Sequence, residues 1–358
     1  MTTTKLQVLD VAKKSEAREK FEIKIKSRVE GQAEAISAVS EVYEMIVAGM
    51  TNNRRPFQNM LFLGPSGVGK TLLVESIAEA IHGDPDCMIK IHCGEYSEDH
   101  QIARLIGSPP GYVGHDTTEP IISINSLTRG WVDNGPRISV LLFDEIEKAS
   151  PRLWALLLGI MDKAELYNGK NQRLLLNHAW VFLTSNVGSR AINLEHVGFT
   201  KSDSWTAITS EAIAAAKKKF DPEFLGRLDQ IITFKPLTKD EMDKVLDREV
   251  QIIWQRAVDR ITGKDPQRPS EDLFSIRLTT PFNNYLLEKG TDKYGARGMR
   301  KTVEQSIAKP LATLIASRQL KVGGVLIFDR KNEKSIIKFK PFEKSKIVLT
   351  DAPLDKEE

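Results

Sequence analysis

Cysteine is scarce in this sequence, which has only Cys87 and Cys93 among its 358 residues. Two cysteines at this spacing make neither a disulfide framework nor a zinc-binding pattern, so we expect a reduced, cytoplasmic setting. The six histidines provide no ligand pair at helical or hairpin spacing, and ordinary packing is the expectation for them. The sequence thus excludes a small fold held together by disulfides and does not indicate a metal site built from histidine and cysteine.

An excess of one charge and a long apolar run are both absent. The chain has 51 Lys and Arg residues against 48 Asp and Glu residues, a formal net charge of +3, whereas nucleic-acid binders carry a basic excess. The most apolar stretch, Leu153–Met161, is far too short to cross a bilayer, and the N-terminal residues lack the apolar core of a signal peptide. We therefore expect neither a membrane nor a nucleic acid as a partner, although a local basic patch is compatible with this charge balance.

Short apolar segments alternate with longer amphipathic ones from Phe21 onward. A helix over Thr71–His82 is predicted after the first apolar segment. Strands separated by helical stretches indicate an α/β fold with a mostly parallel, five-stranded sheet covered by helices. The five predicted strands are residues 59–64, 87–92, 139–145, 179–186 and 229–234.

A second, smaller domain is predicted beyond Lys235-Pro236-Leu237. A long helix over Thr238–Ile261, a further helix after residues 294–299, and two short strands at residues 324–329 and 335–340 indicate an α+β domain. The chain is long enough for two such domains. The predicted division is a polar, helix-prone segment without an evident core face (1–20), a large domain (21–236), a small C-terminal domain (237–348) and a disordered tail (349–358).

A glycine-rich loop joins the first predicted strand to the helix that follows it. Its glycines let backbone N–H groups surround a β-phosphate at the positive end of that helix. In such a loop the lysine reaches the β- and γ-phosphate oxygens and the final hydroxyl binds Mg²⁺. The alternative is a chance glycine-rich turn with a solvated lysine, which the strand–loop–helix context disfavours. The loop consists of Gly64, Pro65, Ser66, Gly67, Val68, Gly69, Lys70 and Thr71.

Two adjacent carboxylates end the third predicted strand. Asp144 is placed to hold Mg²⁺, and Glu145 is placed to act as the general base that activates a water molecule. The alternative is an acidic helix cap, which Asp also suits. Together with the phosphate loop, the pair predicts ATP and Mg²⁺ as cofactors and hydrolysis as the reaction.

At this point the sequence resembles an AAA+ ATPase of the Clp unfoldase and disaggregase family, and in particular the second ATPase module of ClpB- and ClpC-type proteins. The resemblance covers about Phe21 to Phe342 and implies a AAA+ P-loop NTPase domain followed by a lid domain. Relatives usually carry an N-terminal domain and often another ATPase module, so a one-module protein and a piece of a larger system both stay open. The motifs that carry it, in family order, are "RVEGQAEAISAV", "GPSGVGKT", "GSPPGYVG", "LLFDEIEKASP", "TSNVGS", "DPEFLGRLD" and "YGARGMRK".

The resemblance implies further roles around the nucleotide. The segment from Val29 to Gln32 matches the part that packs on adenine, and Asn186 matches sensor 1, which orients water against the γ-phosphate. Arg227 matches the arginine finger that completes a neighbouring subunit's site, and Arg297 matches sensor 2 of the lid domain. Ordinary alternatives are a strand-end cap for Asn186, a surface salt bridge for Arg227 and a helix N-terminal charge for Arg297.

The loop "GSPPGYVGHD" places Tyr112 and Val113 between glycines, and the family uses this position as a pore loop. The resemblance therefore implies a homo-oligomeric, hexameric ring that threads unfolded or tagged proteins through a central channel. A surface turn with a packed tyrosine is the alternative structure. The alternative functions are a AAA+ ATPase acting on nucleic acid or on one protein complex, as a loader or regulator, and a scaffold that only binds nucleotide.

The tripeptide Val197-Gly198-Phe199 lies between the sensor-1 and finger segments. By resemblance, such a tripeptide docks Clp unfoldases on a ClpP-like peptidase, and burial against the chain's own body is the alternative. The chain departs from the family's pattern at residues 117–135 and after Met161, where the usual glycine- and arginine-rich stretches are replaced. Those departures concern substrate choice and subunit contacts rather than hydrolysis.

Overall fold

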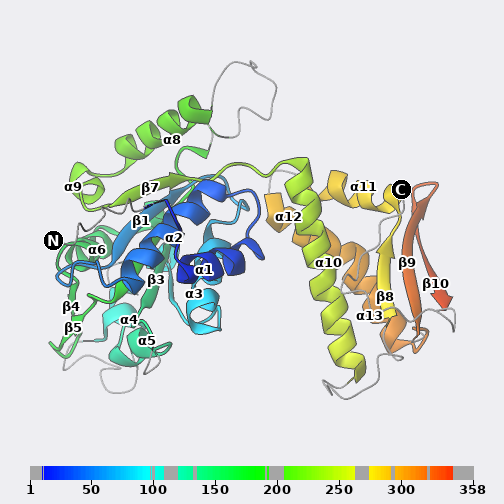
Figure 1. Ribbon diagram of the computed structural model, residues 1–358, viewed down its shortest axis with the longest axis horizontal. Helices are drawn as coiled ribbons and strands as arrows, with labels where there is room; N and C mark the ends of the chain where they lie inside the picture. The colour runs from blue at the N-terminus through cyan, green and yellow to red at the C-terminus, as the bar shows by residue number, and fades with distance from the viewer. Residues whose placement is uncertain are drawn as a thin grey trace, which may run out of the picture. The chain divides into compact units, whose positions relative to one another are not determined.

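The structure is a computed structural model that describes residues 10, 12–96, 98, 101–108, 120–131, 135–189, 192, 205–262, 274–291, 295–320 and 323–341. The chain divides into two compact units (Figure 1). The first unit comprises Met1–Pro65 and Gly69–Pro236, and the second comprises Ser66–Val68 and Leu237–Glu358.

A five-stranded sheet forms the centre of the first unit, in the order β2-β3-β6-β1-β7. Every neighbouring pair is parallel, with Met60 opposite Phe182 and His92 opposite Asp144, so the predicted sheet is confirmed. Because the strands are parallel, their carboxyl ends meet at one edge of the sheet. The strands are β1 (Gln58–Leu63), β2 (Ile89–His92), β3 (Ser139–Asp144), β6 (Ala179–Ser185) and β7 (Gln230–Thr233).

Helices surround this sheet, as expected for an α/β unit. The helix predicted after the first strand is α3 (Lys70–His82). Ser150 caps α6 (Pro151–Lys163) by accepting from the Leu153 N–H, and proline at the first helical position suits that start. The other helical elements are α1 (Glu16–Lys26), α2 (Ala33–Val47), η1 (Cys93–Tyr96), α4 (Ile102–Ile106), α5 (Ile124–Thr128), η3 (Ile146–Lys148), α8 (Trp205–Lys219) and α9 (Pro222–Leu225).

The central strands β1, β3 and β6 are buried on both faces, and their side chains are accordingly mostly apolar on both faces. Alternate residues such as Leu61 and Leu183 share one core cluster with side chains of α6 and α9. The opposite face carries aromatic rings, and the Phe62 ring lies 5.5 Å from Phe182 and 5.0 Å from Phe234, centroid to centroid. This packing fixes the sheet edge on which the polar strand ends gather.

The N-terminal helix begins inside the segment predicted to be polar and helix-prone. Helix α1 begins at Glu16, and its buried residues Phe21, Glu22 and Ile25 all lie beyond residue 20, so the described part of the polar segment contributes no buried residue. The Phe21 ring stacks on Tyr43 of α2, with centroids 4.1 Å apart. The helix therefore runs across the predicted boundary at residue 20.

A β-hairpin between α6 and β6 is absent from the sequence-based expectations. It consists of β4 (Glu165–Tyr167) and β5 (Arg173–Leu175), which pair antiparallel. Leu166 and Leu174 point into the core of the first unit. Figure 1 shows the hairpin near α4 and α5 at one end of this unit. The Asn168-Gly169 dipeptide in its turn is a hairpin signal that the sequence analysis missed.

The second unit combines helices with a three-stranded sheet in the order β10-β9-β8. The long predicted helix and the two predicted strands are present, whereas β8 was not expected despite its alternating burial. Within the described residues, no helix is long and apolar enough to cross a membrane. The elements are α10 (Lys239–Thr262), β8 (Phe274–Leu278), α11 (Thr280–Gly290), α12 (Gly295–Val303), the π-helical η6 (Glu304–Ala308), α13 (Lys309–Ala316), β9 (Gly324–Lys331) and β10 (Lys334–Pro341).

One helix boundary in this unit differs from the expectation. Helix α12 begins at Gly295, inside the "YGARGM" motif, rather than after it. Gly295 has a positive φ of 53°, a conformation that glycine adopts without a steric cost. The motif therefore supplies the first turn of the helix, and Arg297 lies on that turn.

Candidate functional site

The phosphate loop leaves the carboxyl end of β1 and enters α3. Gly64 has a φ of 154°, and a Cβ atom there would lie 3.0 Å from both the Cβ and the carbonyl oxygen of Phe234. The Lys70 side chain is buried at the start of α3 and donates to the carbonyl oxygens of Gly64 (2.7 Å) and Pro65 (2.8 Å). Lys70 Nζ also donates to Asn186 Oδ1 at 3.0 Å. The ammonium group is thus held at the loop by three oxygen acceptors.

Asp144 is the last residue of β3 and lies beside Thr184, near the carboxyl end of β6. Thr184 Oγ1 donates to Asp144 Oδ1 and accepts from the Glu145 N–H at 3.1 Å. Thr71 Oγ1 donates to the same Asp144 oxygen at 3.4 Å. Carboxylate and hydroxyl oxygens close together are ligands that suit Mg²⁺, so the residues present fit this ion.

Glu145 follows Asp144 in the left-handed region, with a φ of 58°. Few residues other than glycine adopt this conformation, and such outliers cluster at functional sites. Its carboxylate accepts from Lys148 Nζ at 2.7 Å and from Asn186 Nδ2 at 3.5 Å. The hydrogen bond with Glu145 raises the pKa of Lys148, which keeps this partner cationic.

Asn186 connects the lysine to the carboxylate at the end of β6. Its Oδ1 accepts from Lys70, its Nδ2 donates to Glu145, and its backbone N–H donates to Glu147 Oε1 at 3.2 Å. Five residues predicted from three separate motifs therefore lie together at one edge of the sheet. They are Lys70, Thr71, Asp144, Glu145 and Asn186.

Val29 lies beside the phosphate loop. It is buried, and a Cβ atom at Gly69 would be 4.0 Å from its Cγ1. Gln32 is also buried, and its carboxamide forms a pair of hydrogen bonds with the backbone of Lys235, at 2.9 Å to the carbonyl and 3.1 Å from the N–H. This segment thus joins the loop region to the last residues of the first unit.

Arg227 lies at the opposite edge of the sheet. Its carbonyl oxygen accepts from Asn59 Nδ2 at the amino end of β1, at 3.1 Å. Its guanidinium donates to the carbonyl of Glu223 at 2.8 Å and pairs with the carboxylates of Glu223 (3.2 Å) and Asp162 (3.9 Å). Arg227 is therefore not brought to the edge that carries Lys70.

The remaining predicted residues fall into two groups. Arg297 is exposed on the first turn of α12 in the second unit, with which Ser66–Val68 also group. Tyr112 and Val113 lie outside the described residues, as do Val197, Gly198 and Phe199. Their roles stay predictions.

Comparison with known proteins gives a family match for each of the two units. The family profile of the AAA domain (Cdc48 subfamily) matches residues 55–231, and that of the C-terminal, D2-small domain of ClpB protein matches residues 237–328. The chain belongs to the Clp family of AAA+ ATPases. The resemblance in the sequence and the AAA+ fold are thereby confirmed.

Three curated relatives of this Clp-family chain show similar degrees of identity. The chaperone protein ClpB of Aquifex aeolicus is 32% identical over 95% of this chain and 32% of the relative. The ATP-binding subunit ClpC of the ATP-dependent Clp protease of Staphylococcus saprophyticus is 34% identical over 81% and 33%. ClpB of Rhodopseudomonas palustris is 34% identical over 87% and 34%. The chain spans about a third of the length of these relatives.

Two solved structures have the same architecture. A closed-state reconstruction of Hsp104 with ATPγS and FITC casein matches with a TM-score of 0.73 and 28% identity, over 90% of this chain and 52% of that chain. The extended Hsp104–casein complex of S. cerevisiae matches with a TM-score of 0.75 and 28% identity, over 91% and 53%.

Several polar residues at this Clp-family site were not found from the sequence. The Thr184 hydroxyl is hydrogen-bonded to the Asp144 carboxylate and to the Glu145 backbone N–H. Lys148 pairs with the Glu145 carboxylate, and His92 Nδ1 lies 3.6 Å from Asp144 Oδ2. Thr184 and His92 lie at or near the carboxyl ends of predicted strands, and this position could have indicated that they belong to the site. Burial raises the pKa of the neighbouring Cys93 thiol, which removes it as a nucleophile.

Proposed function

We propose that this chain is an ATP-hydrolysing subunit of a ring that unfolds or remodels proteins. The observation that carries the proposal is the position of Asn186, which is hydrogen-bonded to Lys70 on one side and to Glu145 on the other. A phosphate-binding cation and a water-activating carboxylate bridged by one amide suit hydrolysis of a nucleotide γ-phosphate.

Each residue at the edge has one task in the proposed reaction. Lys70 neutralises charge on the β- and γ-phosphate oxygens, and Asn186 orients the attacking water. Glu145 accepts a proton from that water as its oxygen bonds to the γ-phosphorus and the bond to the β–γ bridging oxygen breaks, which yields ADP and phosphate. Thr71 and Asp144 would hold Mg²⁺, which supplies further neutralisation of the phosphate oxygens.

Arg227 supports the proposal that the active form is a ring. A residue at the amino edge cannot serve the carboxyl edge of its own sheet, whereas it can serve that of a neighbour in a head-to-tail assembly. A guanidinium supplied in this way stabilises the transferring phosphoryl group. We propose a hexamer with one site at each subunit boundary, in which Arg297 reports the γ-phosphate to the second unit.

The proposed substrate is an extended polypeptide held by Tyr112 and Val113. Support comes from the chaperone name of the ClpB relatives and from the casein that accompanies Hsp104 in both matched structures. Aromatic and aliphatic side chains pack on a polypeptide without reading its sequence.

A cytoplasmic setting belongs to the proposal, since Cys87 and Cys93 are both free thiols.

A peptidase partner is a further part of the proposal. ClpB and ClpC relatives match at 32–34% identity, so the comparisons do not favour a chaperone over a protease subunit. The tripeptide Val197-Gly198-Phe199 favours docking on a ClpP-like barrel, where several copies in a ring gain avidity. Co-sedimentation with such a peptidase, compared between the parent and Phe199→Ala, tests this part. Failure of the parent to bind would remove it.

The decisive experiment measures ATP hydrolysis with and without an unfolded protein, together with unfolding of a folded reporter. We expect the unfolded protein to stimulate hydrolysis and Tyr112→Ala to reduce reporter unfolding more than it reduces client-free hydrolysis. Stimulation by DNA and not by unfolded protein would instead support a nucleic-acid function. Nucleotide binding without any hydrolysis would support a scaffold.

A further inference from the structure

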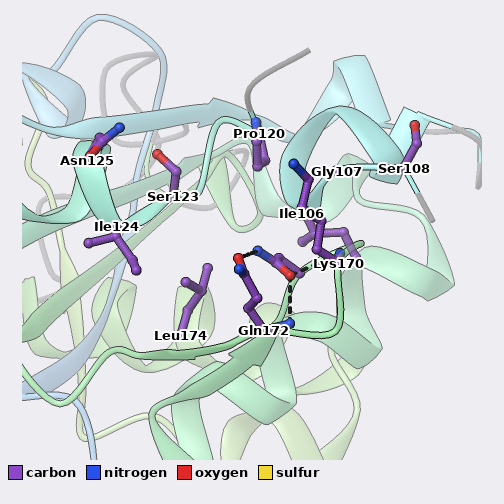
Figure 2. Close-up of a pocket in the computed structure, with 11 residues that line it drawn as sticks. Ile106, Gly107, Ser108, Pro120, Ser123, Ile124, Asn125, Lys170, Gln172 and Leu174 are labelled. Carbon is purple, nitrogen blue, oxygen red and sulfur yellow. Dashed lines mark hydrogen bonds between the residues drawn. The ribbon is translucent and has the colours of Figure 1, made fainter. Parts of the chain in front are cut away.

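The turn of the β4–β5 hairpin touches the backbone from which the Tyr112 loop starts. The N–H of Gly169 in that turn donates to the carbonyl oxygen of Ile106, the last residue of α4, at 2.7 Å. Figure 2 shows Lys170 beside Ile106. Both residues and Gly107 line a pocket of about 270 Å³. Two segments more than fifty residues apart in sequence therefore share a backbone contact.

This contact leaves no room for a side chain. A Cβ atom at Gly169 would lie 2.4 Å from the Gly107 carbonyl oxygen and 2.6 Å from that of Ser108. Both obstacles are backbone atoms, so a clash is relieved only by moving one segment away from the other. Glycine at 169 is required by proximity to the stem of the Tyr112 loop.

The stem is anchored on both arms. The Gly107 N–H donates to the Ala103 carbonyl at 2.8 Å on the outgoing arm. On the returning arm, the N–H groups of Ile121 and Ile122 donate to the carbonyls of Arg104 (3.1 Å) and Leu105 (2.9 Å). A displacement at Gly107 is thus transmitted to the residues that end the loop.

The hairpin turn is rigid enough to act on that stem. Asn168 Oδ1 accepts from the N–H groups of Lys170 (3.0 Å) and Gln172 (2.8 Å), and its Nδ2 donates to Gln172 Oε1 at 2.9 Å. Leu166 and Leu174 fix the strands in the core, and the Leu176 N–H donates to the Ala164 carbonyl at 2.7 Å at the base of the hairpin. The turn is therefore held by the Asn168 side chain and by two strands that are fixed in the core of the first unit.

We infer that Gly169 is a positioning residue for the polypeptide-gripping loop, because the β4–β5 turn fixes the stem at Ile106–Ser108 from which that loop starts. This inference rests on the proposed protein-unfolding function. It assigns the hairpin a task in setting the loop's position, in addition to any contact the hairpin makes with a polypeptide.

The test compares Gly169→Ala with Gly159→Ala, since a Cβ at Gly159 would lie an ordinary 3.8 Å from the Glu165 carbonyl oxygen, the nearest atom outside its own helix backbone and chain neighbours. Hydrogen exchange is measured at the amides of Gly107, Ile121 and Ile122, alongside ATP binding, hydrolysis and reporter unfolding. We expect Gly169→Ala to raise exchange at these amides about tenfold or more, since the local hydrogen bonds open more often. We also expect reporter unfolding per ATP hydrolysed to fall about tenfold or more, since misplacement by about 1 Å has effects of that order. Gly159→Ala should match the parent in every measurement.

Two results would overturn the inference: parental exchange at the stem amides in Gly169→Ala, or parental unfolding per ATP despite raised exchange. If the parent itself unfolds no reporter, the proposed function fails, while the exchange measurement still decides whether the hairpin holds the stem. If Gly169→Ala loses ATP binding through misfolding, Asn168→Ala replaces it. That variant loosens the turn without a clash, and raised exchange at Gly107 then supports the inference, whereas parental exchange refutes it.

Discussion

Replacing Arg227 with alanine tests the division of the site between two subunits. The Arg227 carbonyl accepts a hydrogen bond from Asn59, near the amino end of β1. Gly64, where the phosphate loop starts, is five residues farther along the chain, which corresponds to about 17 Å between Asn59 and Gly64 at about 3.3 Å per strand residue. An arginine side chain is much shorter than this separation. The guanidinium therefore cannot reach the phosphate loop of its own subunit.

We expect Arg227→Ala to lower the rate of ATP hydrolysis strongly and the free energy of unfolding only slightly. Arginine fingers contribute about 10³- to 10⁵-fold to the hydrolysis rate, so Arg227→Ala should lose a factor in that range. The variant also loses a hydrogen bond to the Glu223 carbonyl and a partly exposed ion pair, together worth about 1 kcal/mol of the free energy of unfolding. Nucleotide affinity should change by less than about tenfold because Lys70 and the loop are untouched.

Mixing two inactive variants gives a sharper measurement. In rings of Arg227→Ala and Glu145→Gln subunits, a boundary works when the first subunit supplies Glu145 and the second supplies Arg227. Random assembly at equal amounts produces this order at about one quarter of the boundaries, so the mixture should recover about one quarter of parental activity. Each variant alone should be nearly inactive.

A matched control is Arg55→Ala, which removes a second arginine ion pair at the same edge, 3.6 Å to Asp229. Asp229 keeps its hydrogen bond from the Asn59 N–H at 2.7 Å, so this variant should keep hydrolysis within about twofold of the parent. No recovery in the mixture, although both variants enter the same rings, would refute the trans assignment of Arg227.

Three further outcomes are expected. Lys70→Ala should weaken ATP binding about 10- to 100-fold, measured by calorimetry, because charged hydrogen bonds to phosphate contribute about 1.5–3 kcal/mol; unchanged binding would contradict the loop assignment. Gly64→Ala should lower the free energy of urea unfolding by about 1–3 kcal/mol through backbone strain and crowding, whereas Gly159→Ala should not. Burial lowers the pKa of His82, so as the pH drops the imidazole is protonated in the unfolded chain before it is protonated in the folded one, and stability falls below about pH 6.5. The urea concentration at the unfolding midpoint should therefore decrease less between about pH 7.5 and 5.5 in His82→Gln than in the parent. An identical decrease in both proteins would contradict this cause.

The sequence was most informative where chemistry and periodicity coincide. The five core strands are short, mostly apolar runs, and all but β1 end in a polar residue. The loop from Gly64 to Thr71 has a spacing that few other structures require. Since parallel strands end at a common edge, Asp144 and Asn186 could be placed together before any contact was known. The separation of Arg227 from that edge followed only from the register of β1 with β7.

Contacts between distant backbone segments could not be predicted in the same way. Gln32 bonds to Lys235, 203 residues away, and no local pattern marks either residue as the other's partner. The contact of Gly169 with Gly107 depends on a hairpin whose two strands have three residues each, too short for a clear alternation. The Asn168-Gly169 turn was readable, but its neighbour across the fold was not.

The two hydrogen bonds between Gln32 and Lys235 have a thermodynamic consequence. Gln32 is three residues from Val29, which we propose to contact adenine, and Lys235 is two residues before Leu237, where the second unit begins. Coupling free energy between two sites is reciprocal. If base binding restrains the backbone at Lys235, then a force that pulls on this backbone must lower nucleotide affinity by the same factor. In the proposed ring, resistance from a stable substrate would then weaken nucleotide binding, with the Gln32 carboxamide as the connection.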